Sequence, residues 1–204
     1  MALGGGIFTT QNKILPGSYI NFVSAARAYT IGERGVAALP VELDWGEEEK
    51  VFEVTAEEFQ RNSLKLFGYP VDDDRMKGIR DLFKHCQKAL FYRLNKGAKA
   101  TCTFADAKYS GTKGNDLKIV IKDDVDDESS YLVQTLMGFQ IVDEQLVKTK
   151  EELVDNEYVT WKQELTLEAT ASTPLASGTN GEPVTGTEYQ NALDALESYK
   201  FNAL

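Results

Sequence analysis

Histidine and cysteine are almost absent from this sequence, and their scarcity excludes most metal and nucleophile chemistry. The 204 residues include one histidine and two cysteines. His85 and Cys86 are adjacent in an expected helix, and adjacent helical side chains do not face each other, so the two do not form a nucleophile–base pair. These three residues are also too few for a zinc site of standard ligand spacing. We expect Cys86 and Cys102 to be reduced, buried thiols without a disulfide framework.

Positive charge is also scarce, which argues against several classes of partner. The sequence has 22 lysines and arginines against 32 acidic residues, a net charge of −10 and a pI of about 4.7. Nucleic acids and anionic lipids are bound by basic surfaces that neutralise phosphates, and the sequence has no basic stripe with interleaved aromatic residues. The sequence therefore predicts no nucleic-acid partner and no membrane partner.

Long apolar runs are missing as well. No stretch approaches the length of a membrane span. Residues Met1–Phe8 lack the basic region and the apolar run of a signal peptide. We expect a protein that is made in the cytoplasm without a signal peptide.

No sequence motif for catalysis or cofactor binding is present. There is no Walker A sequence and no dinucleotide fingerprint. Gly111–Gly114 matches the GxxG of a KH loop in letters only, because it joins expected strands rather than helices. The acidic runs Asp72–Asp74 and Asp123–Glu128 could hold calcium, but the second lacks the glycine and distal glutamate of an EF-hand loop. The sequence therefore predicts no catalytic residue, no cofactor and no metal.

What is present is enough apolar surface for a core, arranged at first as mixed helix and strand. Thr55 and Glu58 match the capping-box pattern and open a helix that Gly68 can end. A second helix is indicated by apolar residues at helical spacing: Met76, Ile79, Leu82, Phe83 and Cys86. Strands are expected at residues 19–23, 35–43, 51–54 and 89–94.

The composition changes near residue 95. All six arginines precede this point, and the net charge is −1 for residues 1–94 and −9 for residues 95–204. Strand signals separated by turns then succeed one another, which is typical of an antiparallel sandwich or barrel-like domain. They cover residues 100–109, 117–122, 131–136, 141–148, 159–165 and 167–171, with a short helix expected at 149–156.

Helical signals return after a loop rich in serine, threonine, glycine and proline at residues 172–184. Thr185 and Glu188 form a second capping-box pattern. The next apolar stripe consists of Tyr189, Ala192, Leu193 and Leu196. From Phe201 onward the residues resemble the start of another strand.

A β-rich segment between two pieces of mixed type predicts an inserted domain. We therefore expect an α+β fold in which residues 19–94 and 184–204 form an incomplete α/β core. Residues 95–183 are expected to form an inserted antiparallel all-β domain that is separable from the rest.

Residues 1–18 have the features of an N-terminal extended arm. A flexible Gly4–Gly6 and a turn at Pro16–Gly17 enclose a short strand-prone segment. That segment consists of Ile7, Phe8, Thr9, Thr10 and Gln11. Such a segment can pair inside its own domain or add to the sheet edge of a neighbouring subunit, and it is the candidate subunit-interface site.

Seven phrases in order along the chain resemble those of a known family. They are Ile14–Phe22, Leu39–Gly46, Ile79–Phe83, Phe91–Asn95, Ala107–Asp116, Gly178–Gly181 and Leu196–Leu204. Together they resemble the tail sheath proteins of contractile-tailed phages of Gram-positive bacteria, of defective prophages and of phage-tail-like bacteriocins.

The resemblance implies a structural subunit rather than an enzyme. Such a subunit would polymerise with copies of itself through terminal-arm strand pairing, around a tail tube protein and above a baseplate, and would contract to drive the tube into a target cell. The resemblance also implies a location in a virion tail or tail-like particle, after synthesis in the bacterial cytoplasm. Members of the family are longer, which implies that the C-terminal half of the core is absent here.

Two other functions are alternatives at the level of sequence. A surface or adhesin-like binding module would use the β-rich residues 95–183, and the missing signal peptide argues against it. A hydrolase would use acidic residues, and the absence of a converging constellation argues against that.

Overall fold

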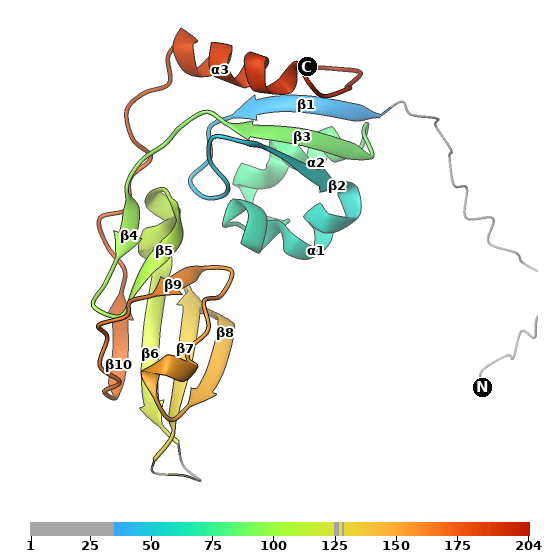
Figure 1. The fold of residues 1–204 in the computed structure, drawn as a ribbon. Helices are drawn as coiled ribbons and strands as arrows, with labels where there is room; N and C mark the ends of the chain where they lie inside the picture. Colours follow the sequence, from blue (N-terminus) through green and yellow to red (C-terminus); the bar gives the residue numbers. More distant parts are fainter. Residues whose placement is uncertain (1–34, 125–126, 128) are drawn as a thin grey trace, which may run out of the picture. The chain divides into compact units, whose positions relative to one another are not determined.

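A computed structural model describes residues 35–124, 127 and 129–204, which belong to one compact unit, residues 33–204 (Figure 1). The candidate arm with Ile7–Gln11 and the strand expected at residues 19–23 lie outside the described residues. We call residues 35–94 and 184–204 the α/β module, and residues 95–183 the β module.

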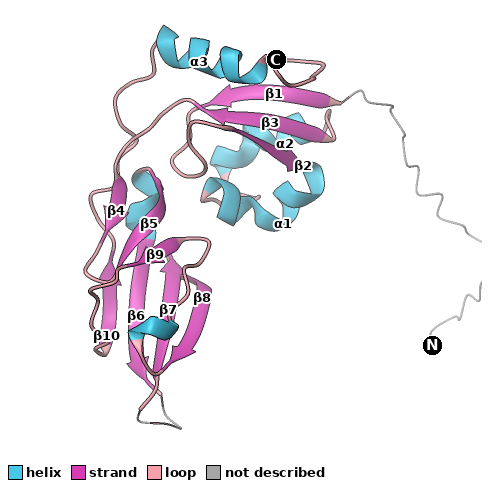
Figure 2. Ribbon diagram, in the orientation of Figure 1, coloured by secondary structure: helices cyan, strands magenta, loops and turns pink. Residues whose placement is uncertain are grey.

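A small mixed sheet forms the centre of the α/β module. Its strands are β1 (Val36–Val41), β2 (Val51–Thr55) and β3 (Lys88–Arg93), in the order β1-β3-β2. β1 is parallel to β3, so the chain must cross over between them, and it does so through β2, α1 (Ala56–Phe67) and α2 (Lys77–Phe83). These two helices cover one face of the sheet, and α3 (Gly186–Leu196) covers the other (Figures 1 and 2).

The central strand β3 is buried on both faces, as its continuous apolar run predicts. Ala89 and Phe91 pack in the core cluster that includes α1 and α2. Leu90 and Tyr92 point to the opposite face, where they pack near Leu196 and Ala192 of α3 respectively.

The expected helix ends are found in the first helix but not in the second. Thr55 and Glu58 form a reciprocal capping box, and Gly68 ends α1 in the left-handed conformation at φ 77°. The second helix was expected to reach Cys86, but α2 ends at Phe83. The chain turns there because it must enter β3, and the amide of Cys86 closes the turn on the carbonyl of Leu82 at 3.1 Å.

Two antiparallel sheets make up the β module. One contains β4 (Lys99–Thr101), β5 (Ala105–Ser110) and β9 (Val159–Trp161), in the order β4-β5-β9. The other contains β6 (Leu117–Asp123), β7 (Tyr131–Met137), β8 (Gln140–Val147) and β10 (Thr170–Pro174), in the order β10-β6-β7-β8. The predicted α+β fold class, a partial α/β core with an antiparallel all-β insertion, is confirmed.

Several expected elements of the β module differ in extent. The single strand expected at residues 100–109 is divided into β4 and β5, because the chain reverses where the amide of Cys102 bonds the carbonyl of Ala105 at 2.9 Å. The strand expected at 159–165 ends at Trp161, and the helix expected at 149–156 is a single 3₁₀ turn, Lys150–Glu152.

The C-terminal residues return to the sheet of the α/β module. Thr185 and Glu188 form the expected capping box, but only Ala192 and Leu196 of the predicted stripe are buried. After α3, Ala203 forms a parallel bridge with Ala37 of β1, and the amide of Ala38 donates to the carbonyl of Ala203 at 2.8 Å. The chain therefore begins to pair with the outer edge of β1, a partner that the sequence did not predict, although only a single bridge forms where the start of a strand was expected.

Candidate functional site

The histidine, cysteine and acidic residues considered in the sequence for catalysis or metal binding do not form a common site. Among the described residues, no group of three or more histidine, cysteine, aspartate or glutamate side chains could hold a metal ion. Cys86 and Cys102 are unpaired and half-buried rather than fully buried. Burial raises the pKa of the Cys86 thiol, which disfavours the thiolate that a nucleophile requires.

The acidic runs organise turns. Asp73 accepts a hydrogen bond from the amide of Arg75 at 2.9 Å and caps a 3₁₀ turn. The carboxylate of Asp127 is bonded by Lys148, Ser129 and Ser130, and these contacts hold its pKa well below the usual range. Both carboxylates therefore stabilise turns of the chain by accepting hydrogen bonds within them.

No described helix is long and apolar enough to cross a membrane. The features that suit an assembly protein are instead the two sheet edges of the α/β module. An edge strand presents unpaired amides and carbonyls, to which another strand can add. β2 has no described strand on its outer side, and β1 is bridged there only near Ala37. The candidate interface residues Ile7–Gln11 lie outside the described residues, so their pairing with either edge stays a prediction.

An apolar hollow of about 690 Å³ lies beside β1, on the side of α2. Its apolar lining residues include Leu39, Val41, Leu43, Met76, Ile79 and Leu82. Charged and polar side chains also line this hollow: Glu42, Asp44, Tyr69, Arg75, Asp81 and His85. His85 is thus placed at an apolar surface rather than among catalytic partners.

A polar cluster lies where the two modules meet. The carboxylate of Asp44 accepts hydrogen bonds from the Tyr69 hydroxyl at 2.5 Å and from Asn180 Nδ2 at 2.7 Å. Burial raises the pKa of Asp44, but these bonds and the charges of Arg75 and Arg93 lower it by more. Burial and the neighbouring carboxylate raise the pKa of Tyr69, so its hydroxyl stays protonated and can donate.

This cluster was missed by reasoning from sequence. Asn180 lies in a polar loop with no catalytic or ligand motif around it. The available signal was the set of phrases shared with a family, because Leu39–Gly46 contains Asp44 and Gly178–Gly181 contains Asn180.

Two family models match consecutive parts of the chain. Residues 34–94 match the model described as "Tail sheath protein Gp18 domain III N-terminal region". Residues 95–180 match the model described as "Phage tail sheath protein beta-sandwich domain". The chain belongs to the phage tail sheath protein family. This is a structural family and not a family of enzymes.

Individual relatives of this sheath protein agree with the family assignment. It is 34% identical over 227 residues to the phage-like element PBSX protein XkdK of Bacillus subtilis, an alignment covering 99% of this chain and 48% of that relative. The uncharacterized protein YqbK of the same organism shows the same identity and coverage. The chain spans about half the length of these curated relatives.

Solved structures show the same similarity in three dimensions. The sheath tail protein of Desulfitobacterium hafniense superposes with a TM-score of 0.76 and 35% identity, over 91% of this chain and 44% of that one. The sheath tail protein of Listeria innocua gives a TM-score of 0.75 and 33% identity, over 84% and 40% of the two chains.

Proposed function

We propose that this chain is part of the structural subunit of a contractile tail sheath, which polymerises around a tail tube and contracts to drive the tube into a target cell. The observation that carries the proposal is the match of contiguous residues 34–180 to two sheath domains in succession. The subunit would be made in the bacterial cytoplasm and would act in a virion tail or tail-like particle. Its partners would be copies of itself, the tail tube protein and the baseplate.

Strand addition is the proposed link between subunits. The segment Ile7–Gln11 has the length and strand propensity to add to a neighbour's sheet edge, and β2 offers an outer edge with no described partner. Main-chain hydrogen bonds of this kind are directional, and several links per subunit act multivalently. Subunits joined in this way can slide relative to one another without separating.

Contraction is proposed to draw on energy stored in the extended lattice. The sequence has no phosphate-binding loop that would indicate a nucleotide fuel. An extended sheath would then be a trapped arrangement of higher energy, and contraction would be a switch between two packings of the same subunits.

Negative-stain electron microscopy of the complete gene product tests the proposed function. Purified protein at high concentration should form regular tubes with a hollow centre, because sheath subunits assemble with copies of themselves. A product that stays monomeric or forms only irregular aggregates, in the presence and absence of its tail tube protein, would contradict the proposal.

A further inference from the structure

The chain passes between the two modules twice, through residues 95–98 and through residues 178–182. We call these segments the two crossings, and they are hydrogen-bonded to each other. The amide of Thr179 donates to the carbonyl of Ala98 at 3.0 Å, and the amide of Ala98 donates to Thr179 Oγ1 at 3.0 Å. A Cβ atom at Gly97 would lie 1.9 Å from the carbonyl oxygen of Thr179, and one at Gly181 would lie 1.8 Å from that of Lys96. Only glycine permits this approach, so the crossings are packed backbone against backbone.

Asn180 lies in the second crossing, and its side chain is hydrogen-bonded to groups from both modules. Its Nδ2 donates to Asp44 Oδ1 at 2.7 Å in the α/β module, and its Oδ1 accepts from the amide of Thr112 at 2.9 Å in the β module. Its main-chain carbonyl accepts from Asn95 Nδ2 at 3.2 Å. The Asn95 side chain is itself bonded to the amide and carbonyl of Leu43, at 2.7 and 2.9 Å. One polar network therefore links the end of β1 to both crossings.

Arg93, the last residue of β3, adds a buried charge to the same junction. Its side chain is fully buried, and Nη1 donates to the carbonyl of Gly46 in one module and to that of Ser110 in the other, each at 3.0 Å. Glu48 lies 3.7 Å from this nitrogen and also accepts from the amide of Ser110 at 2.9 Å. A buried guanidinium is costly unless it is paired and bonded, and separating the modules would take away one of the two carbonyls bonded to Nη1.

Trp45 makes the apolar part of the junction. It lies in the loop after β1, yet its side chain is fully buried in the core cluster of the β module, against Tyr109 and Tyr158. Its Nε1 donates to the carbonyl of Lys65 near the end of α1, at 3.0 Å. Gly68 makes room for it, because a Cβ atom there would lie 2.9 Å from Trp45 Cβ. The indole is thus anchored in one module and inserted into the other.

We propose that these contacts form a latch that joins the two modules into one rigid body. The latch consists of Trp45, Arg93, Asn180 and the glycine pair Gly97 and Gly181. A flexible insertion would require two free linkers, whereas both crossings here are bonded to each other and to both modules. The latch prevents hinge motion at the crossings and transmits a force on the β module to the sheet of the α/β module. It is a property of this chain by itself and does not depend on sheath assembly.

Hydrogen–deuterium exchange of the whole chain tests the latch. Asn180→Ala should accelerate exchange of the bonded amides in peptides covering residues 95–98 and 178–182 by at least about tenfold, since the bond to the charged Asp44 and the bond from the amide of Thr112 are lost. Asn156→Ala is the matched control. Asn156 also bonds through both side-chain atoms, to Thr135, Asp143 and two amides, but all within the β module. The control should destabilise the β module without the selective change at the crossings.

A second variant keeps the test valid if Asn180→Ala does not fold. Asn180→Asp preserves the shape but places a carboxylate beside that of Asp44, so the latch should open at neutral pH and close again when the new group is protonated. Protection factors at the two crossings should therefore fall in the variant at pH near 7.5 and recover toward those of the unmodified chain at pH near 5. Equal protection in variant and unmodified chain at both pH values, or equal loss in Asn180→Ala and Asn156→Ala, would overturn the proposal.

Discussion

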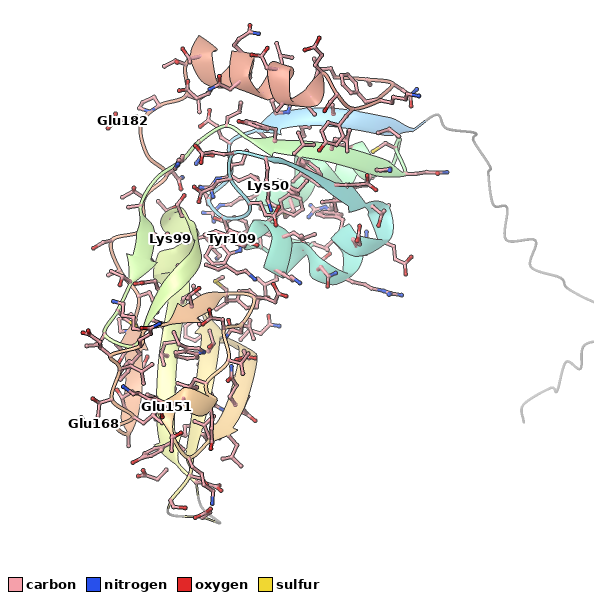
Figure 3. All side chains as sticks on the ribbon, in the orientation of Figure 1. Lys50, Lys99, Tyr109, Glu151, Glu168 and Glu182 are labelled. Carbon is pink, nitrogen blue, oxygen red and sulfur yellow. The ribbon has the colours of Figure 1, made fainter. Side chains whose placement is uncertain are left out.

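The indole ring of Trp45 meets the ring of Tyr109 edge to face, with centroids 5.2 Å apart and an interplanar angle of 87°. The contact joins the loop after β1 to β5, and it lies beside a shallow cleft of about 250 Å³ that Lys50, Lys99 and Tyr109 help to line (Figure 3). The pKa of Tyr109 is raised to about 12. Burial is the largest cause, and the negative charges of Glu47 and Glu157 add to it. The aromatic pair is therefore uncharged at neutral pH, and pairs of this geometry contribute about 0.5–1.5 kcal/mol beyond the burial of their surface.

Trp45→Ala should lower the free energy of unfolding by about 3–5 kcal/mol, because it leaves a cavity in the core of the β module. Urea denaturation followed by circular dichroism measures the change. Phe139→Ala is the control: this ring is 98% exposed, so its removal should change stability by no more than about 0.5 kcal/mol. A loss in Trp45→Ala no larger than that of the control would count against the inserted indole.

Gly181→Ala should destabilise the chain more than Gly138→Ala. Both glycines have positive φ, at 80° and 65°, so both substitutions incur a backbone cost of about 1–2 kcal/mol. Only at Gly181 would the new Cβ also collide with a carbonyl, 1.8 Å away, whereas nothing lies within 4 Å at Gly138. Thermal melting of the two variants side by side measures the difference, and equal melting temperatures would refute the close backbone contact.

The charge of Asp44 should make the free energy of unfolding depend on pH in the acid range. Its folded-state pKa is below the usual 3.8, so the charged form is favoured by folding. The stabilisation by the charged Asp44 is fully present above the pKa that this carboxyl has in the unfolded chain. It is lost as the pH falls through the lower pKa that the carboxyl has in the folded chain. In Asp44→Asn the decline of stability between about pH 4 and pH 2 should therefore be shallower. Urea midpoints across this range measure the slope, and identical slopes in both proteins would exclude Asp44 as a contributor.

Deleting residues 1–13 from the complete gene product should abolish tubes and leave the folded modules intact. Under the proposed strand addition, the deletion removes every link through Ile7–Gln11 at once and leaves the described residues of both modules in place. Negative-stain microscopy measures assembly, and circular dichroism shows whether the modules remain folded. Normal tubes from the deletion variant would exclude the arm as the link without affecting the family assignment.

Residues 95–183 expressed alone should give a β-rich circular dichroism spectrum but a lower urea midpoint than the same strands in the whole chain. The excised module lacks Trp45, and its core around Tyr109 and Tyr158 is left partly uncovered. An apolar dye should consequently bind the excised module more strongly than the whole chain. An unchanged midpoint would show that the modules are energetically independent.

Elements whose ends are fixed by local chemistry could be predicted from the sequence. The capping boxes at Thr55 and Thr185 and the glycine end at Gly68 depend on residues within one or two helical turns, and all three are found as expected. The turn between β4 and β5 was not predictable, because residues 102–104 contain no glycine, proline, asparagine or aspartate to mark it. Pairing with distant strands decides such a boundary.

The contacts of the latch could not be predicted from short stretches of sequence, for a similar reason. Asn180 and Asp44 are 136 positions apart, and neither residue type in its own surroundings indicates a contact. Trp45 falls within residues 19–94, which the sequence assigns to the α/β core, while its side chain is buried in the core of the β module. Only the folded chain shows that a tryptophan from one part completes the core of the other.

The bonding of Ala98 to Thr179 places both ends of the β module next to each other, which has a consequence for genetic exchange. A coding segment for a different β module could be transferred as a single cassette, because its two ends have to meet the recipient protein at one place only. Such a cassette would have to bring an asparagine for Asp44, glycines for the close crossings and a slot for the recipient's Trp45. Cassettes lacking these features would join in frame and still give unstable hybrids, so the β module can be exchanged between relatives only together with its own residues at the two crossings.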